Sequence, residues 1–481
     1  MPAIRFLLNG LWRAEESVPP TTTVLDYLRR VHRLNGTKEG CAEGDCGACT
    51  IMVGRREEGR LRYDAVNSCL MLVPQLDASA VVTIEGLSAA DGGLHVVQQA
   101  LLDTDATQCG FCTPGFAMTM AAFQHGGEPA RDELIHEALA GNLCRCTGYR
   151  PIVEACRRIA GGAMDHLAER ARRDADDLAG MTQITEYRHV DRCVYLPRTL
   201  AELARLVKEN PEGRLLAGGT DLTLAMARER RVVRILIATS GVPELKRIGV
   251  APDWLELGAA VTYSEALPYF DVSLPTLGAL VRRLGSRQIR NLGTIAGNLA
   301  TASPIGDMLP CLMALDAVVM LRSTAGQRPV PIEKFLTGYR RTAMAPGEFI
   351  ESVRLPRLQP EQEFHAYKLS KRFDQDIATV IAGFRIAVES GTLKQLRAAY
   401  GGMAPLVKRA SAVERRLVGK PWIAATLDGI ETALAEDFQP IDDHRGSAAY
   451  RLRAAANLLR RLQQETTGGP GEGAPLRLEA L

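Results

Sequence analysis

The sequence predicts a multidomain α+β protein. Residues 1–88 contain short apolar runs separated by glycines and polar turns, which is typical of a small β-rich domain. Residues 90–162 place apolar residues three and four positions apart, the spacing of amphipathic helices. From about residue 190, strand-like runs, glycine turns and apolar helices follow one another. At about 150 residues per domain, 481 residues suggest roughly three domains.

The first region suits a β-grasp sheet with one helix. We expect strands over residues 4–8, 50–53 and 81–84, since these runs are apolar and bounded by turns. A leucine-rich stretch over 24–32 follows a run of threonines, which are good helix caps, and predicts the helix.

The second region predicts four helices, over residues 96–102, 115–124, 132–140 and 152–161. Pro114 and Pro151 fall at the starts of two of them, where proline is tolerated because its missing N–H has no intrahelical partner.

Four cysteines of the first region form one group: Cys41, Cys46, Cys49 and Cys69. Their C-x4-C-x2-C…C spacing matches that of a plant-type [2Fe–2S] ferredoxin, in which each iron takes two thiolates. Zinc is a poor alternative, because zinc sites usually use paired C-x2-C knuckles. The first group therefore predicts a [2Fe–2S] cluster.

Four cysteines of the second region form another group: Cys109, Cys112, Cys144 and Cys146. A C-x2-C pair and a C-x-C pair could supply four thiolates to zinc. The one-residue spacer suits a binuclear cluster better than a zinc knuckle, but the spacing alone leaves both metals open. Each pair precedes a predicted helix, whose N-terminal dipole favours negative charge.

The remaining cysteines, Cys156, Cys193 and Cys311, have no matched partner, and we expect them to be small buried side chains. The eight histidines form no H-x-x-H or H-E-x-x-H pattern, so no mononuclear metal site is predicted.

Composition predicts a soluble cytoplasmic protein. Apolar residues make up 46% and charged residues 24%, and the net charge is +2 without a long basic run, so neither nucleic acid nor membrane is an expected partner. The N-terminal residues do not resemble a secretory signal, and no apolar stretch reaches membrane-spanning length. A reducing compartment also suits thiols that serve as ligands.

A charged stretch with thin apolar spacing, residues 168–183, is expected to be a helical or disordered linker. Beyond it, residues 215–217 predict a strand and Gly218, Gly219, Thr220 and Asp221 a tight loop, which would present N–H groups to a phosphate or be a plain surface turn. The loop lacks G-x-G-x-x-G, so a dinucleotide-binding Rossmann domain is not predicted.

Residues 287–307 are rich in small side chains and are expected to form a long functional loop without regular structure. This loop could clamp a pyrophosphate together with the first loop, and Asp307 could accept a hydrogen bond from a hydroxyl of the ligand.

The last segment predicts strands over 379–388 and 393–399, helices over 422–434 and 448–464, and a flexible tail.

Two motifs carry a family resemblance. QCGFCTPG followed by GNLCRCTGYRPI resembles the helical [2Fe–2S] domain of the xanthine dehydrogenase and aldehyde oxidase family of molybdenum hydroxylases. TKEGCAEGDCGACT is similar to the first domain of the same family. The resemblance implies that both cysteine groups bind [2Fe–2S] clusters. It also implies that Gln108 touches the pterin edge, where the residue type alone allows capping or solvent contact.

The two glycine-rich stretches resemble the FAD domain of this family, which has the vanillyl-alcohol-oxidase-like fold. The resemblance implies FAD contacts from Leu215, Leu216, Ala217, Gly218, Gly219, Thr220, Asp221, Leu222, Thr294, Ile295, Ala296, Gly297, Asn298, Asp307, Ile350 and Lys368. Leu284 departs from the mammalian pattern, which has phenylalanine against the flavin ring. An aliphatic side chain can still pack on the ring, but stacking is lost.

The expected domains are a ferredoxin-like [2Fe–2S] domain (1–88), a helical [2Fe–2S] domain (89–165), a linker (166–188), an FAD-binding domain (189–358), a C-terminal α+β flavoprotein domain (359–466) and a flexible tail (467–481).

The chain ends after the flavin module, so molybdopterin is expected on a large partner subunit, in an (αβ)2 heterotetramer. KLSKRFDQDIA and YGGMAPLVKRA are especially like the small subunit of bacterial xanthine dehydrogenases. The resemblance implies transfer of electrons from hypoxanthine or xanthine, oxidised to urate on the partner, through both clusters and FAD to NAD+. No catalytic residue is expected in this chain. Two alternatives are a reductase subunit of an aldehyde oxidoreductase and a stand-alone electron carrier, and the acceptor could be oxygen or a quinone.

Overall fold

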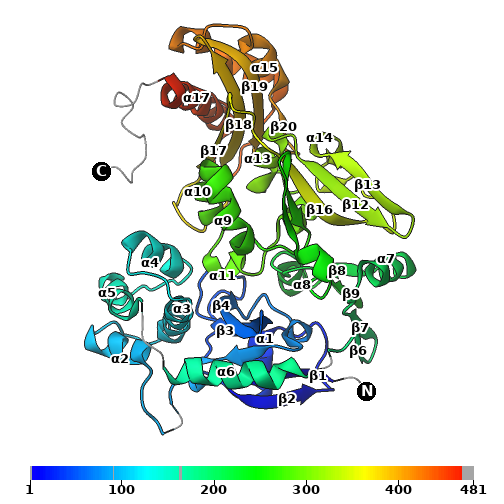
Figure 1. Ribbon diagram of the computed structural model, residues 1–481. Helices are drawn as coiled ribbons and strands as arrows, with labels where there is room; N and C mark the ends of the chain where they lie inside the picture. The colour runs from blue at the N-terminus through cyan, green and yellow to red at the C-terminus, as the bar shows by residue number, and fades with distance from the viewer. Residues whose placement is uncertain (1–2, 90, 162–164, 182, 468–481) are drawn as a thin grey trace. The chain divides into compact units, whose positions relative to one another are not determined.

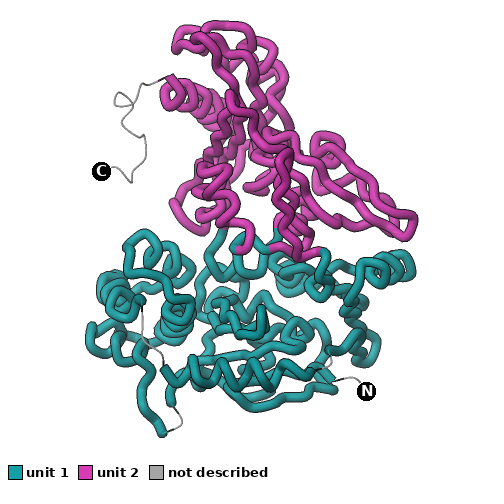
Figure 2. The backbone as a smooth tube through the Cα atoms, viewed as in Figure 1, with its two compact units in different colours: residues 1–244, 262–264, 285–294 teal, residues 245–261, 265–284, 295–481 magenta. Residues whose placement is uncertain are grey.

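The computed structural model describes residues 3–89, 91–161, 165–181 and 183–467. The chain forms two compact units (Figure 2). Unit 1 comprises Met1–Glu244, Thr262–Ser264 and Gly285–Thr294, and unit 2 comprises Leu245–Val261, Glu265–Leu284 and Ile295–Leu481. Both units contain helices and sheets (Figure 1), which confirms the predicted multidomain α+β class.

Unit 1 begins with a five-stranded sheet in the order β2-β1-β5-β3-β4. Its strands are β1 (Ile4–Leu8), β2 (Leu11–Glu15), β3 (Thr50–Glu57), β4 (Arg60–Asn67) and β5 (Ala80–Val82). The three predicted strands are confirmed, although β3 is longer than expected and β5 ends two residues earlier. Only the β1–β5 pair is parallel.

Alternation along β3 builds two cores, because successive side chains of a strand point to opposite faces. Ile51 and Val53 pack in a core with the helical residues Val24 and Leu28. Met52 packs on the other face, in a core that includes the helices of residues 96–179. The sheet is therefore covered by different elements on its two faces.

The predicted helix over 24–32 is confirmed, but it changes type along its length. Helix α1 (Val24–Asp26) opens with the Thr23 hydroxyl accepting a hydrogen bond from the N–H of Asp26 at 3.1 Å. It continues as a π-helical turn over Tyr27–Val31. Together with the sheet, this helix completes the predicted β-grasp arrangement.

The four predicted helices of the second region are confirmed as α2 (Val96–Asp103), α3 (Thr113–His125), α4 (Asp132–Leu139) and α5 (Arg150–Ile159). The stretch expected to be a linker is helical over most of its length, in α6 (His166–Ala179). Leu167, Ala171, Ala175 and Leu178 of α6 are buried at three- and four-residue spacing and pack in the same core as these helices. The apolar spacing of this stretch looks thin in the sequence because two of these four buried residues are alanines.

A second sheet of unit 1 has the order β6-β7-β9-β8. Its elements are β6 (Glu186–His189), β7 (Arg192–Tyr195), β8 (Arg214–Leu216) and β9 (Ile235–Ala238), with helices α7 (Leu200–Glu209) and α8 (Leu222–Arg228). The predicted strand over 215–217 is β8, shifted by one residue. Unit 1 also includes helix α11 (Arg287–Arg290), which contacts β4.

Unit 2 contains an antiparallel sheet in the order β10-β11-β16-β12-β13. Its strands are β10 (Ile248–Val250), β11 (Trp254–Gly258), β12 (Val318–Ser323), β13 (Gly326–Pro331) and β16 (Phe349–Pro356), and β14 (Leu336–Gly338) pairs with β15 (Arg341–Thr342). The helices up to residue 335 are α9 (Tyr263–Ser273), α10 (Pro275–Arg282), α12 (Ile295–Thr301), α13 (Met308–Ala314) and α14 (Ile332–Phe335).

The expectation of a long irregular loop over 287–307 is wrong, because α11 and α12 lie within it. Ser286 caps α11, since its hydroxyl accepts from the N–H of Ile289 at 3.2 Å. The small residues of this segment are thus part of helices and their connections rather than of one long irregular loop.

The last part of unit 2 is a sheet in the order β17-β18-β19-β20, formed by β17 (Gln362–Leu369), β18 (Val380–Glu389), β19 (Thr392–Gly401) and β20 (Lys408–Arg409). It shares a core with α15 (Ser411–Leu417), α16 (Ile430–Asp437) and α17 (Ala448–Thr467). The two predicted strands and the last helix are confirmed. A helix over 422–434 is wrong in part, because Ala424–Leu427 is a 3-10 turn and α16 begins only after Gly429. The predicted flexible tail lies, from residue 468, outside the described residues.

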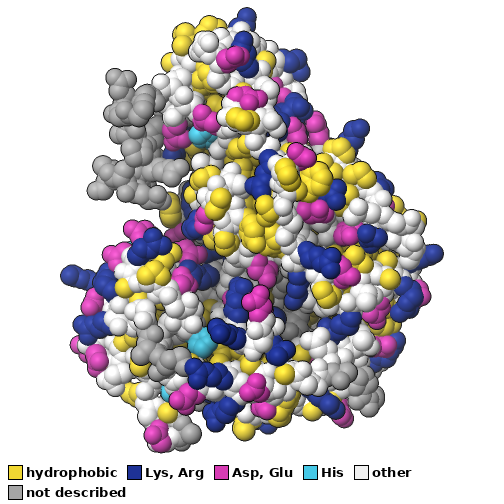
Figure 3. Space-filling model, in the orientation of Figure 1, with side chains coloured by type: hydrophobic (Ala, Val, Ile, Leu, Met, Phe, Trp, Pro, Cys, Tyr) yellow, Lys and Arg dark blue, Asp and Glu magenta, His cyan; other side chains and the backbone are white. Residues whose placement is uncertain are grey.

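Acidic and basic side chains are interspersed on the face shown in Figure 3, in keeping with the small net charge. Within the part of the chain that the structure describes, no helix is both long and apolar enough to cross a membrane.

Adjacent leucines of α2 provide a matched test of the helical core. Leu101 is 4% exposed and Leu102 is 59% exposed. We expect Leu101→Ala to lower the free energy of unfolding by about 2–5 kcal/mol, because it leaves a cavity. Leu102→Ala should change it by less than about 0.5 kcal/mol. Urea unfolding followed by circular dichroism measures both, and equal losses would contradict the packing described for α2.

Candidate functional site

The hairpin β3–β4 positions two cysteines of the first group. Cys49 directly precedes β3 and Cys69 follows β4, whose Asn67 pairs with Thr50. The hydroxyl of Ser68 donates to the carbonyl of Cys49 at 2.7 Å and ties the two ends together. Both cysteines are buried. The register of the hairpin thus brings Cys49 and Cys69 together from 20 residues apart in sequence.

The loop before β3 brings the other two cysteines of this group together. The N–H of Cys41 donates to the sulfur of Cys46, and the N–H groups of Glu43 and Cys46 donate to the sulfur of Cys41, at 3.3–3.4 Å. A hydrogen bond from the Cys46 thiol, opposed by burial, lowers the pKa of Cys41 to about 5. The same pairing and burial raise the pKa of Cys46. Backbone N–H groups aimed at sulfur are the donors that stabilise a cluster thiolate.

Cys49 and Cys69 form a second thiol pair in the same way. A hydrogen bond from Cys69 lowers the pKa of Cys49, and the pKa of Cys69 is raised by this hydrogen bond and by burial. The first group therefore consists of two close thiol pairs, Cys41 with Cys46 and Cys49 with Cys69.

The second group lies at the starts of helices α3 and α5. Cys112 is the N-cap residue of α3, and Cys144 and Cys146 lie in the turn before α5. Thiol hydrogen bonds pair Cys109 with Cys146 and Cys112 with Cys144. Unlike Cys49 and Cys69, Cys109 and Cys146 are exposed.

Local donors favour a thiolate at Cys144. The hydroxyl of Thr147 lies 3.2 Å from its sulfur, and the N–H groups of Cys146 and Thr147 donate to the sulfur at 3.4 and 3.5 Å. Although burial raises it, these hydrogen bonds lower the pKa of Cys144 to about 7. Burial and the neighbouring Cys144 raise the pKa of Cys112 to about 12.

The donor chemistry of both groups fits a binuclear iron–sulfur cluster. Each group offers four thiols and no nitrogen or carboxylate ligand, arranged as two pairs. Among the described residues, no three or more His, Cys, Asp or Glu side chains converge in a way that could hold one metal ion. Two thiolates for each of two irons are what a [2Fe–2S] cluster requires. When bound, such clusters carry single electrons.

The two cysteine groups are joined directly by backbone. The N–H of Leu143 donates to the carbonyl of Cys46 at 3.0 Å, so Cys46 of the first group is hydrogen-bonded to the residue preceding Cys144. Motifs almost one hundred residues apart in sequence are thus adjacent.

The expected FAD contacts at Leu215–Leu222 run from β8 through a turn into α8, all within unit 1. The carbonyl of Ala217 accepts a hydrogen bond from Gln75 at 3.2 Å, which ties this turn to the ferredoxin-like fold six residues after Cys69. A Cβ at Gly218 would lie 1.7 Å from the carbonyl oxygen of Leu292, so glycine is required there by packing alone. The glycine signal therefore has a structural cause besides phosphate binding.

Other expected FAD contacts lie in unit 2. Ile295, Ala296, Gly297 and Asn298 form the first turn of α12, directly after Thr294 of unit 1, and Asp307 precedes α13. The Oδ1 of Asn298 is buried and has no hydrogen-bond partner among the described residues, which fits a ligand donor at this position. Leu284 and Ile350 are also in unit 2, and Ile350 is buried in β16.

Asp307 and Lys368 form a buried ion pair. Lys368 Nζ lies 2.6 Å from Asp307 Oδ2 and donates to the carbonyl of Arg283 at 3.0 Å. Burial raises the pKa of Asp307, and Lys368 opposes this shift. The carboxylate expected to accept from a ligand hydroxyl is thus already bound to a cation from β17.

Gln108 is exposed beside Cys109. It caps neither neighbouring helix, because α2 ends with Thr104 and α3 begins with Cys112 as the N-cap. Contact with a pterin on another chain remains a prediction.

Sequence reasoning missed the polar residues between the cysteine groups, foremost Gln288, Asn142 and Glu137. Gln288 is fully buried and hydrogen-bonds to Thr119 and Asn142 of the helical region and, at 3.5 Å, to Thr50 of the ferredoxin-like region. The capping serine before R-Q-I-R was a usable helix signal that could have revealed α11. Cys156, Cys193 and Cys311 are buried and free, as predicted.

Four known domain families match successive parts of the chain. They are described as a 2Fe-2S iron-sulfur cluster binding domain (residues 6–74), a [2Fe-2S] binding domain (83–157), an FAD binding domain in molybdopterin dehydrogenase (185–358) and a CO dehydrogenase flavoprotein C-terminal domain (365–466).

Relatives include the xanthine dehydrogenase of Emericella nidulans, which is 31% identical over 96% of this chain and 38% of its own length. Xanthine dehydrogenase 2 of Arabidopsis thaliana is 33% identical over 88% of this chain and 36% of its own length. The chain thus spans little more than a third of these relatives.

Solved structures are similar over part of the chain. A cyanide-inactivated Cu,Mo-CO dehydrogenase chain aligns with a TM-score of 0.53 and 25% identity, over 56% of this chain and 94% of that chain. Quinoline 2-oxidoreductase from Pseudomonas putida 86 aligns with a TM-score of 0.52 and 26% identity, over 56% of this chain and 94% of that chain.

The cysteine assignment predicts separable losses of iron. We expect Cys46→Ala to remove one [2Fe–2S] EPR signal and about half of the iron, since each cluster depends on its own four thiolates. Cys146→Ala should remove the other signal. Cys156→Ala, which changes a buried cysteine outside both groups, should leave the iron content unchanged. Loss of both signals in either single variant, or none, would contradict the grouping.

The buried ion pair predicts a cost for removing one partner. We expect Lys368→Met to destabilise the folded chain by about 3–5 kcal/mol, because Asp307 would remain buried without its cation. The bound flavin, measured by absorbance per protein, should also fall. The control is Lys371→Met, since the Lys371 side chain is exposed and donates to the carbonyl of His444. A normal flavin content and stability in Lys368→Met would refute the role of the pair.

The sheets, helices, paired thiols and domain matches agree over nearly the whole described chain. The chain consists of two [2Fe–2S] domains, an FAD-binding domain of the molybdopterin dehydrogenase type and a CO dehydrogenase-type flavoprotein C-terminal domain, and it is similar to xanthine dehydrogenases over little more than a third of their length.

Proposed function

We propose that this chain is the small subunit of a bacterial-type xanthine dehydrogenase, carrying electrons from the molybdopterin centre of a separate large subunit to NAD+ through two [2Fe–2S] clusters and FAD. The overall reaction would be xanthine + H2O + NAD+ → urate + NADH + H+, with hypoxanthine oxidised by the same chemistry. The extended similarity to xanthine dehydrogenases, 31–33% identity, supports this choice of substrate.

The observation that carries the proposal is the position of the first cysteine group. On one side, Cys46 is hydrogen-bonded to Leu143 beside the second group. On the other side, Gln75, six residues after Cys69, is hydrogen-bonded to Ala217 of the expected FAD loop. This arrangement supports an order in which electrons enter at the second group and leave through the first toward FAD.

The chain's own residues have distinct tasks in this proposal. The four thiols of each group would hold one cluster, while N–H groups of Glu43, Cys46 and Thr147 stabilise the negative sulfurs. Residues of the turn after β8 and of the first turn of α12 would bind FAD, with Asp307 held by Lys368. When bound, FAD converts single electrons into the two-electron reduction of NAD+.

The second group lies at a surface suited to a protein partner. Phe111, Leu143 and Tyr149 are 48%, 45% and 38% exposed beside the exposed Cys109 and Cys146. Large apolar side chains next to a redox site favour docking of another chain. We place the large, molybdopterin-binding subunit there, with Gln108 at the pterin edge, in an (αβ)2 heterotetramer in the cytoplasm.

A second candidate is the same electron-transfer role in another molybdenum hydroxylase. The similarity to chains of CO dehydrogenase and of quinoline 2-oxidoreductase favours this alternative, since substrate choice would belong to the large subunit. An aldehyde oxidoreductase is a further member of this class, and oxygen or a quinone are alternative acceptors.

Anaerobic titration with xanthine tests the proposal. The chain would be co-expressed with candidate large subunits and followed by absorbance and EPR. We expect two distinct [2Fe–2S] signals and flavin bleaching, both reversed by NAD+. Reduction by an aldehyde, carbon monoxide or quinoline but not by xanthine would keep the electron chain and refute the substrate. Zinc in place of iron would refute the electron-transfer function itself.

A further inference from the structure

The two cysteine groups approach each other through glycines. A Cβ at Gly47 would lie 2.2 Å from the carbonyl oxygen of Gly141, and a Cβ at Gly115 would lie 2.3 Å from that of Gly47. No side chain fits at such distances. All three glycines belong to the cysteine motifs, as CGAC, CTPG and GNLC. They let the backbone of the ferredoxin-like loop lie directly on that of the helical region.

A buried amide network closes this contact. Asn142 Nδ2 donates to the carbonyl of Gly47 at 3.0 Å, and the Thr119 hydroxyl donates to Asn142 Oδ1 at 2.7 Å. Gln288 Nε2 donates to Asn142 Oδ1 and to the Thr119 hydroxyl, both at 3.0 Å. Asn142 and Gln288 are 2% and 0% exposed. One carboxamide from α11 is therefore bonded both to Asn142, which donates to the Gly47 carbonyl from the helical region, and to Thr119, which donates to Asn142.

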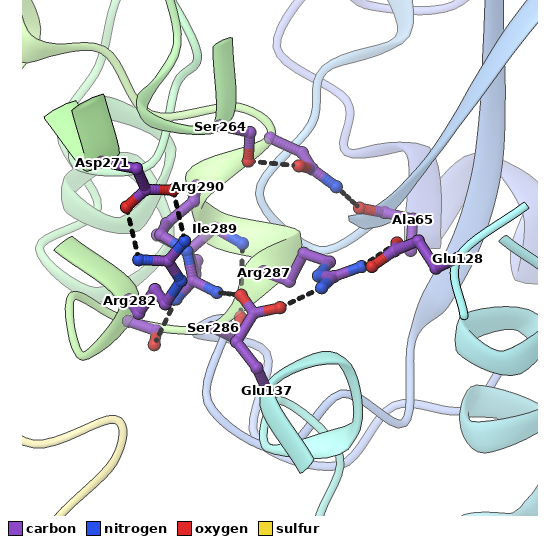
Figure 4. Close-up of polar contacts among 12 residues, drawn as sticks. Ala65, Glu128, Glu137, Ser264, Asp271, Arg282, Ser286, Arg287, Ile289 and Arg290 are labelled. Carbon is purple, nitrogen blue, oxygen red and sulfur yellow. Dashed lines mark hydrogen bonds and ion pairs between the residues drawn. The ribbon is translucent and has the colours of Figure 1, made fainter. Parts of the chain in front are cut away.

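Ion pairs hold α11 against the same region. Arg287 and Arg290 both bind the carboxylate of Glu137 in α4, and Arg287 also binds Glu128 (Figure 4). Burial would raise the pKa of Glu137, but the two arginines lower it. Because Arg290 is 2% exposed, solvent screens these pairs poorly.

The same segment contacts the first cysteine group and the expected FAD loop. Ile289 packs against Cys49, Cys69 and Leu70. The carbonyl oxygen of Leu292 lies 1.7 Å from the position that a Cβ would take at Gly218. Asn291 donates to the carbonyl of Ala65 in β4 at 2.8 Å and accepts from Ser264 (Figure 4). Within unit 1, residues 285–294 therefore touch the first cysteine group, the helical region that carries the second group, and the flavin-side turn.

We propose that Gln288 is a positioning residue that fixes the separation of the two clusters and their placement relative to the FAD loop of unit 1. It touches no cysteine sulfur and acts through Asn142 and the Gly47 carbonyl. This inference rests on the proposed electron-transfer function. Its consequence is kinetic, because the rate of electron transfer between two centres falls as the distance between them grows.

Two variants test Gln288 from different directions. Gln288→Met keeps the length of the side chain and removes its hydrogen bonds. Gly141→Ala adds a methyl group 2.0 Å from Gln288 Oε1 and removes no polar group. Gln99→Met and Gly180→Ala are matched controls, since Gln99 bonds Asp103 on the surface and a Cβ at Gly180 meets nothing within 4 Å.

The measurements are made on the full chain with its cofactors, co-expressed with the large subunit, and need no substrate. EPR of the dithionite-reduced protein reports the magnetic interaction between the two reduced clusters, which falls steeply with their separation. Laser-flash reduction of the flavin reports how fast the electron redistributes to the clusters. We expect both variants to keep iron and FAD, to weaken the magnetic interaction and to slow redistribution severalfold, while both controls remain unchanged.

A wild-type magnetic interaction and a wild-type redistribution rate in both variants would overturn the inference. Loss of iron from both variants would overturn it too, because it would assign Gln288 to folding or cluster assembly. If only one of the two variants loses iron, the magnetic interaction and the redistribution rate of the variant that keeps its iron decide the test. Absence of two [2Fe–2S] signals from the wild-type chain would instead refute the proposed function, so the two failures are distinguishable.

Discussion

The contact between the two cysteine loops is the constraint on which the rest of unit 1 depends. Its core is a backbone approach at Gly47, Gly115 and Gly141, with Leu143 hydrogen-bonded to the carbonyl of Cys46. A Cβ at Gly47 or Gly115 would lie 2.2–2.3 Å from a carbonyl oxygen of the facing loop, so a side chain at either position would force the two loops apart. The ferredoxin-like domain and the helical domain therefore belong to one compact unit and share a hydrophobic core.

Segment 285–294 extends this body. Its short helix is bound by ion pairs to α4, by the Gln288 amide to the contact itself and by Ile289 to the first cysteine group. The Nε2 of Gln288 is bonded, whereas its Oε1 is buried without a hydrogen-bond partner among the described residues. Buried hydrogen bonds and ion pairs are directional, so breaking one leaves a costly unpaired group, and they restrict the geometry of the contact. Electron transfer between fixed centres requires such a geometry, whereas folding alone does not.

The two cysteine groups differ in their surroundings. Cys49 and Cys69 are buried beneath Leu70 and Ile289, whereas Cys109 and Cys146 are exposed next to Phe111 and Leu143. At the first site, this chain buries Cys49 and Cys69 and leaves Cys41 and Cys46 half-buried. A cluster at the second site would gain its shielding from a partner, in keeping with a place at the entrance of an electron path.

Local sequence determined much of this protein. Cysteine spacing, the strand and helix periods and the glycine turn predicted both metal groups, the β-grasp sheet, four helices and β8, because these depend on neighbouring residues. The tertiary structure decided the irregular parts: α11 and α12 where a loop was expected, the late start of α16 and the packing of α6 through alanines. The tertiary structure also determined the role of Gly47, Gly141, Asn142 and Gln288 in the contact between the two cysteine loops. Gly141 lies 94 residues from Gly47, Asn142 bonds Gly47 over 95 residues and Gln288 bonds Asn142 over 146 residues, and no local pattern specifies a hydrogen bond or a close approach over such a separation.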